Sequence, residues 1–296
     1  MAGVVLLSAG CGAAQRTQSA APTPFAYDAS RPLGLRDTGR ANGAYPIAVR
    51  NVSYAVPGGR VQAYLAIPPG RDRVPAVVYL HGSGGDRVQL LAPAVWVAGR
   101  RAVGLTITMP SSTPGPQPGT PEQALRRERT LFVADIVAVR RAVDLLRSLP
   151  RVDGSRIGLV GWSLGARVGA VVAGVEPRIR AFALMSGGAS PVAAYVARAP
   201  ALLRAEVRRV LTTLDPLRWI ARARPGTILL QDGRKDTIVP RRALLALAHA
   251  APARTELRWY RAPHELSVRA YREQLDWLSR KLPIRGPAVA GARTGP

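Results

Sequence analysis

A serine flanked by glycines is the strongest candidate for chemistry in this chain. Ser163 is the centre of residues 161–165, G-W-S-L-G, which fit the pattern G-x-S-x-G. An apolar run, 156–160, precedes the motif, and a helix-like run of small residues, 166–173, follows it. A strand that turns sharply into a helix exposes the central hydroxyl and needs small residues on both sides. The pattern therefore predicts a nucleophilic serine at the end of a strand.

A glycine-rich loop is the second candidate for chemistry. Residues 81–85, H-G-S-G-G, follow the apolar run 74–80, which is typical of a buried parallel strand. Glycines at a strand end let backbone N–H groups face a developing negative charge. We expect an oxyanion to be held by the N–H of Leu164 and that of Ser83 or its neighbour. His81 is expected to fix this loop rather than to act as a base.

A carboxylate that could orient an imidazole follows the apolar run 227–231. Asp236 comes after a glycine turn and before a Val-Pro pair that starts a helix, so it is the preferred candidate. Asp232 lies nearer the strand and remains the alternative. An ordinary turn or helix-capping role would also suit Asp236.

The general base must come from three histidines. His249 lies within a helical pattern, and His81 is assigned to the glycine-rich loop. His264 follows a strand-like stretch, 257–261, and precedes a helical run, 265–281. It is therefore the one histidine that is both in a loop and late enough in the chain to serve Ser163.

The chain order of these three residues, Ser163, Asp236 and His264, is that of the α/β-hydrolase fold. Residues 50–282 resemble the dienelactone-hydrolase and prolyl-oligopeptidase-like group of serine hydrolases. The resemblance implies a mainly parallel sheet flanked by helices, and hydrolysis of a small-molecule ester through an acyl-enzyme, without a cofactor. Because the nucleophile is serine, dienelactone hydrolysis at a cysteine-based site is less expected.

Two alternative functions stay open at this point. The same three residues could serve a peptidase or a thioesterase. The fold could instead belong to a catalytically silent surface lipoprotein that binds a ligand. No Cys/His cluster points to a metal, and no G-x-G-x-x-G motif after a strand points to a dinucleotide.

The elements that must position these residues alternate along residues 46–282, about 240 residues, which suits one α/β domain. Residues 61–67, 103–109 and 182–185 are predicted strands. A helix is predicted from an apolar face made by Phe132, Ile136, Val139, Val143 and Leu146. The Pro- and Gly-rich segment 111–121 is expected to lie above the carboxyl ends of the strands.

A helical insertion is predicted at residues 189–224. Leu202, Leu203, Val207 and Leu211 are expected to form one apolar stripe along it. The insertion could cover the pocket as a cap or pack as a surface helix pair with no gating role.

The two ends of the chain carry separate predictions. Residues 1–11 resemble a bacterial lipoprotein signal, with lipid expected on Cys11, which is the only cysteine. Residues 12–45 are predicted to be a disordered tether and 283–296 a disordered tail. The chain is thus expected to be exported and held at the outer face of a bacterial membrane, with a secreted or cytoplasmic location as the alternative.

The charge balance is strongly basic, with 42 Lys and Arg against 18 Asp and Glu, a net charge of +24. Such a charge favours contact with an anionic membrane surface. Nucleic-acid binding is not expected, because no recognition motif is present and aromatic residues do not interleave a basic stripe.

Overall fold

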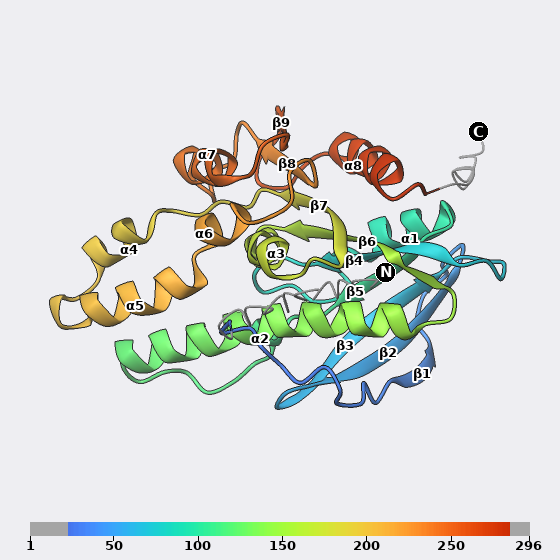
Figure 1. The fold of residues 1–296 in the computed structure, drawn as a ribbon, viewed down its shortest axis with the longest axis horizontal. Coiled ribbons are helices and arrows are strands. Elements are labelled where there is room, and N and C mark those ends of the chain that lie inside the picture. Colours follow the sequence, from blue (N-terminus) through green and yellow to red (C-terminus); the bar gives the residue numbers. More distant parts are fainter. Residues whose placement is uncertain (1–22, 285–296) are drawn as a thin grey trace, which may run out of the picture.

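One nine-stranded sheet organises the chain in the computed structural model, which describes residues 23–284 (Figure 1). The strand order is β1-β2-β3-β5-β4-β6-β7-β8-β9. Strands β1, β2, β3 and β5 pair antiparallel, and the sheet is parallel from β5 to β9. The strands are β1 (Arg36–Arg40), β2 (Ala48–Val56), β3 (Gly59–Ile67), β4 (Val74–Leu80), β5 (Val103–Ile107), β6 (Val152–Trp162), β7 (Ile179–Met185), β8 (Ile228–Gly233) and β9 (Glu256–Tyr260).

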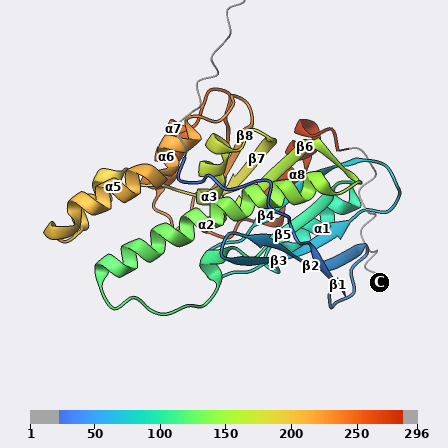
Figure 2. The ribbon, with the colours of Figure 1, turned by 60° about the horizontal axis from the view of Figure 1, so that its bottom comes forward.

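Helices cover both faces of this sheet (Figures 1 and 2). They are α1 (Leu91–Gly99), α2 (Pro121–Ser148), α3 (Leu164–Val175), α4 (Val192–Arg198), α5 (Arg204–Leu214), α6 (Pro216–Ile220), α7 (Arg241–Ala250) and α8 (Val268–Lys281). Helices α2, α3 and α6 share one apolar core with the sheet, and α1 and α8 share another. Every residue of β4 is buried, as expected for a strand covered on both faces. The predicted α/β-hydrolase fold is confirmed.

Helix α2 is longer than its apolar face predicts. Thr120 caps its start by accepting the Gln123 N–H at 3.2 Å, and Pro121 occupies the first turn. Its buried residues begin only at Asp135, because the first half extends past the sheet beside α5 (Figure 1). The preceding segment forms a short 3-10 helix, Pro110–Ser112, directly after β5, and the Ser111 N–H donates to Asp135 Oδ1 at 2.9 Å.

The predicted insertion contains α4, a 3-10 helix (Ala201–Leu203), α5 and α6. The predicted stripe is wrong at Leu202, which is 97% exposed at the turn between α4 and α5. The 3-10 helix has fewer residues per turn than an α-helix, so side chains before and after it do not share one face. As a result, Leu203 and Val207 are half-buried while Leu202 faces solvent. The fully buried positions of α5 are Val210 and Leu214.

Residues 23–33, here called the N-terminal strap, pack on the domain, although the sequence analysis predicted a disordered tether there. Phe25 is fully buried and meets the Trp219 ring edge to face at 5.5 Å between centroids. The Tyr27 hydroxyl donates to Asp144 Oδ2 at 2.9 Å, and Arg140 donates to the Phe25 carbonyl at 2.7 Å. The prediction of a disordered 12–45 is therefore wrong for residues 23–45, which also include β1.

Several predictions about the ends lie outside the described residues. These are the signal segment with Cys11, residues 12–22 of the tether, and residues 285–296 of the tail. Ile284, within the predicted tail, is buried against the core that contains α8. Across residues 23–284, no helix combines the length and apolarity needed to cross a bilayer.

Candidate active site

Ser163 lies at the turn between β6 and α3, in a backbone conformation that few residues other than glycine adopt. Its φ is 55° and its ψ is −113°. A Cβ at Gly161 would come within 2.3 Å of the Gly165 carbonyl oxygen, and one at Gly165 within 2.3 Å of the Leu80 oxygen. The motif needs both glycines because the backbone passes this close. Such strain is typical of functional sites.

Three side chains that are far apart in the sequence form one hydrogen-bonded chain. His264 Nε2 lies 2.9 Å from Ser163 Oγ, and His264 Nδ1 lies 2.8 Å from Asp236 Oδ2. His264 is buried, and the Asp236 side chain is only 1% exposed. A neutral imidazole that donates from Nδ1 to the carboxylate can accept the serine proton at Nε2.

The Asp236 carboxylate is fixed by its own turn. Its Oδ1 accepts the N–H groups of Ile238 and Val239, both at 2.9 Å, which leaves Oδ2 for the imidazole. Asp232 is buried in β8, and burial, helped by the nearby Asp236 charge, raises the pKa of its carboxyl to about 7. The structure therefore places Asp236, and not Asp232, against the histidine.

Two residues that the sequence analysis did not identify hold the histidine loop. Trp162 Nε1 and Ser186 Oγ both donate to the His264 carbonyl, at 3.2 and 2.8 Å. The Trp162 ring also packs on the imidazole, with 5.1 Å between centroids. The sequence offered weak signals for both residues, since Trp162 is inside the serine motif and Ser186 begins a Ser-Gly-Gly segment after a predicted strand.

The glycine-rich loop lies against the nucleophile. A Cβ at Gly82 would lie 2.7 Å from the Trp162 ring and 3.4 Å from Ser163 Cβ. The Gly82 N–H donates to Gln89 Oε1 at 2.8 Å, which ties the loop down; Gln89 was also not predicted. Within residues 23–284, neither the Ser83 N–H nor the Leu164 N–H has a described acceptor. These two donors are thus free for an oxyanion.

His81 has only main-chain partners. The Met109 N–H donates to His81 Nε2 at 2.9 Å, so Nδ1 carries the proton and donates to the Gly82 carbonyl at 2.7 Å. Burial lowers the pKa of this imidazole. His249 is exposed in the last turn of α7. In the described structure, neither histidine ring forms a hydrogen bond with Ser163.

The described part of the chain holds no group of three or more His, Cys, Asp or Glu residues placed to bind a metal ion.

The residues gathered at Ser163 are suited to one kind of chemistry. A hydroxyl, a base and an orienting carboxylate stand beside two free N–H donors, the set that acyl transfer requires.

Comparisons with known proteins found one partial family match and one partial relative. The model of a family described as BAAT / acyl-CoA thioester hydrolase C terminal matches residues 139–217. The peroxisomal succinyl-coenzyme A thioesterase of Mus musculus is 28% identical over 131 residues. That match covers 44% of this chain and 28% of the relative, so the chain spans less than a third of its length.

Solved structures show the same fold over most of the chain. An acetyl xylan esterase from a Thermoanaerobacterium species has a TM-score of 0.70 at 16% identity, covering 84% of this chain and 88% of its own. One from a Paenibacillus species has a TM-score of 0.70 at 19% identity, covering 85% and 90%. These structures show that the chain shares the α/β-hydrolase fold of the two esterases, while the family model and the mouse relative, both described as thioester hydrolases, match part of the chain.

Proposed function

We propose that this chain is a serine hydrolase that cleaves carboxylic esters through an acyl-enzyme on Ser163. The observation that carries the proposal is the hydrogen-bonded chain from Ser163 through His264 to Asp236. The free N–H groups of Ser83 and Leu164 supply the second requirement, a place for negative charge on the carbonyl oxygen.

The proposed reaction has two halves. His264 Nε2 takes the Ser163 proton while Oγ attacks the ester carbonyl, and the Ser83 and Leu164 N–H groups bind the oxyanion. His264 then gives the proton to the leaving alkoxide, and an acyl-serine remains. In the second half His264 takes a proton from water, the hydroxide attacks the acyl-serine, and the carboxylic acid leaves as Oγ is reprotonated. Asp236 stabilises the imidazolium in both halves.

The test is Ser163→Ala assayed with 4-nitrophenyl butyrate. We expect kcat to fall at least about 10⁴-fold, because no other described hydroxyl contacts His264 Nε2. A fluorophosphonate probe should label the unsubstituted protein at Ser163. Undiminished ester turnover in the variant would overturn the proposal. If the protein is folded and the probe does not label it, the result would favour the alternative of a catalytically silent protein that binds a ligand.

Thioester cleavage is the second candidate, supported by the family described as an acyl-CoA thioester hydrolase and by the thioesterase relative. The acyl-enzyme on Ser163 would be the same, and only the leaving group would differ. Butyryl esters, thioesters and anilides compared on one enzyme preparation separate the candidates. A kcat/KM for the thioester far above that for the ester would assign the chain to thioesters, and efficient cleavage of the anilide would point to peptides.

A further inference from the structure

The N–H of Ser83, one of the two proposed oxyanion donors, takes its direction from the residue before it. The Gly82 carbonyl and the Ser83 N–H belong to one planar trans peptide group, so the N–H points opposite to the carbonyl. The carbonyl oxygen accepts the His81 Nδ1–H at 2.7 Å, and the Gly82 N–H donates to Gln89 Oε1. The orientation of the Ser83 N–H therefore depends on the His81 ring.

The His81 ring is held in turn by the segment that follows β5. Its Nε2 accepts the Met109 N–H at 2.9 Å, and both residues are buried. Met109 also begins the 3-10 helix Pro110–Ser112, because its carbonyl accepts the Ser112 N–H at 3.0 Å. A shift of this 3-10 helix would therefore move the Met109 N–H and the imidazole bonded to it.

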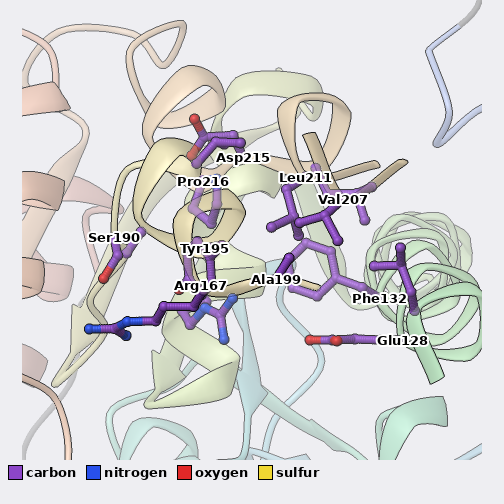
Figure 3. Close-up of a pocket in the computed structure, with 15 residues that line it drawn as sticks. Glu128, Phe132, Arg167, Ser190, Tyr195, Ala199, Val207, Leu211, Asp215 and Pro216 are labelled. Carbon is purple, nitrogen blue, oxygen red and sulfur yellow. The ribbon is translucent and has the colours of Figure 1, made fainter. Parts of the chain in front are cut away.

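Asp135 of α2 holds this 3-10 helix in place. Its Oδ1 accepts the Ser111 N–H at 2.9 Å, and within residues 23–284 this is the one hydrogen bond between α2 and the 3-10 helix. Phe132, one turn earlier in α2, instead faces a mostly apolar cavity of about 280 Å³ between α2 and the helical insertion (Figure 3). The described lining of that cavity includes no residue of the candidate active site. The polar link from α2 toward the glycine-rich loop thus starts at Asp135.

The Asp135 carboxyl occupies this place at a cost in stability. Its side chain is fully buried, and its Oδ2 has no hydrogen-bond partner within residues 23–284. Burial raises the pKa of the carboxyl to about 6, although hydrogen bonding to Ser111 opposes this change. An apolar side chain of similar size would avoid the cost of burying an unpaired oxygen. The bond to Ser111 therefore explains a carboxyl at this position, and packing does not.

We propose that Asp135 is a positioning residue for the oxyanion donor Ser83 and that it acts through the 3-10 helix and the His81 ring. Asp135 fixes the 3-10 helix, the Met109 N–H fixes the imidazole, and the imidazole fixes the peptide group that contains the Ser83 N–H. An oxyanion donor is most effective when it is oriented before the negative charge develops. This inference rests on the proposed acyl-enzyme on Ser163.

The test compares two substitutions of Asp135 in the assay with 4-nitrophenyl butyrate. Asp135→Leu has a similar shape and removes the acceptor, whereas Asp135→Asn keeps an oxygen that can accept the Ser111 N–H. Loss of a whole oxyanion donor costs about 100- to 1000-fold in kcat, so a donor that is only misdirected should cost less. We expect kcat and kcat/KM to fall together by about 10- to 100-fold in Asp135→Leu, and by less than about threefold in Asp135→Asn.

Asp144→Leu is the matched control, because Asp144 is another largely buried aspartate of α2. Its carboxylate binds Tyr27 of the N-terminal strap and Arg178, and its side chain is 13% exposed. This variant should unfold at a lower urea concentration than the unsubstituted protein, since it leaves a part-buried arginine with one partner fewer. Its kcat should nevertheless change less than about threefold, because Asp144 has no bond to the 3-10 helix.

A trifluoromethyl ketone gives a second readout, because it forms an oxyanion when a serine adds to it. Its Ki should rise in Asp135→Leu by the same factor as kcat/KM falls, and it should not change in Asp144→Leu. A loss of stability alone would not produce this parallel.

A double-mutant cycle tests the path through His81. If Asp135 acts through the imidazole, the kcat of Asp135→Leu/His81→Ala should lie within about threefold of that of His81→Ala. Losses that multiply would show that Asp135 acts by another route, and they would overturn the inference.

A kcat within about threefold of the unsubstituted protein in folded Asp135→Leu would also overturn the inference and leave the proposed function intact. An equal loss in Asp144→Leu would show a general effect on α2, with the same consequence. If Asp135→Leu does not fold, Asp135→Ala takes its place with the same limits.

Failure of the unsubstituted protein to hydrolyse the ester would instead count against the proposed function. NMR spectra of the histidine ring nitrogens would still decide whether Asp135 positions this loop, because the chain has only three histidines. The His81 signals should shift in Asp135→Leu and not in Asp144→Leu. Unchanged His81 signals in Asp135→Leu would overturn the inference.

Discussion

His81 and His264 occupy comparable places, yet they have opposite surroundings. Both are buried, and each follows a parallel strand, β4 or β9, at the carboxyl edge of the sheet. His81 bonds only to main-chain atoms, whereas the His264 ring bonds to the side chains of Ser163 and Asp236. Burial therefore does not distinguish a reactive histidine from a structural one, and the hydrogen-bond partners do.

The difference is set at one atom, Nε2. In His81 this nitrogen already accepts the Met109 N–H, so it has no lone pair left for a substrate or a serine. In His264 the same nitrogen faces Ser163 Oγ, and a carboxylate on the far side stabilises the charge that a transferred proton creates. The first histidine joins two loops, and the second is placed to move protons.

The largest expected effect comes from His264→Ala. Ester turnover should fall about 10⁴-fold, because Ser163 loses its base. The free energy of unfolding should fall by less than about 2 kcal/mol, since the exchange removes one ring with two side-chain hydrogen bonds. Urea denaturation and initial rates on the same samples check both numbers. A variant that keeps a tenth of the activity would remove the distinction between the two histidines.

The two aspartates sharpen the comparison on the His264 side. Asp236→Asn should lower kcat about 10³- to 10⁴-fold, because an amide cannot stabilise the imidazolium and favours the wrong tautomer. Asp232→Asn should lower kcat less than about tenfold, since the hydrogen bond of the imidazole goes to Asp236 and not to Asp232. Steady-state kinetics of the two variants, measured at one pH, compares their losses of kcat. Equal losses would mean that Asp232 shares the orienting role.

The smallest effect concerns stability at the His81 side. His81→Ala should lower the free energy of unfolding by about 2 to 4 kcal/mol, because the Met109 N–H and the Gly82 carbonyl lose a buried partner. The pKa of His81 is lowered from 6.5, so the unfolded chain binds the proton more readily. The stability from this group is complete above pH 6.5 and is lost as the pH falls below it.

Urea denaturation at pH 5 and pH 8 measures this pH dependence. The unsubstituted protein should lose more stability between the two values than His81→Ala does. An equal loss would show that the pH dependence arises at other groups.

Local sequence patterns predicted the central part of the site. The glycines around Ser163 indicate a turn where two backbone segments approach closely, and β4 and the second half of β6 are apolar runs. His264 could be chosen because so few histidines exist and only one lies late in a loop. The order of elements then predicted the fold class.

Other features depend on contacts between distant segments, and no local pattern reports those. Trp162 and Ser186 hold the His264 carbonyl only because β6, β7 and the histidine loop end at the same edge. Phe25 and Tyr27 are an isolated aromatic pair in an Ala- and Pro-rich stretch, so no periodicity indicated that Phe25 is buried. Leu202 was misplaced because a short 3-10 turn interrupts the helical period.

The N-terminal strap anchors the insertion at its C-terminal foot. Phe25 lies against Trp219 of α6, and the strap is also bonded to Arg140 of α2. The insertion is thus pinned where it rejoins the sheet, while its far turn at Leu202 projects into solvent. A protein trimmed to begin at residue 34 would keep every residue of the site and lose these contacts with Trp219 and Arg140 at the foot of the insertion.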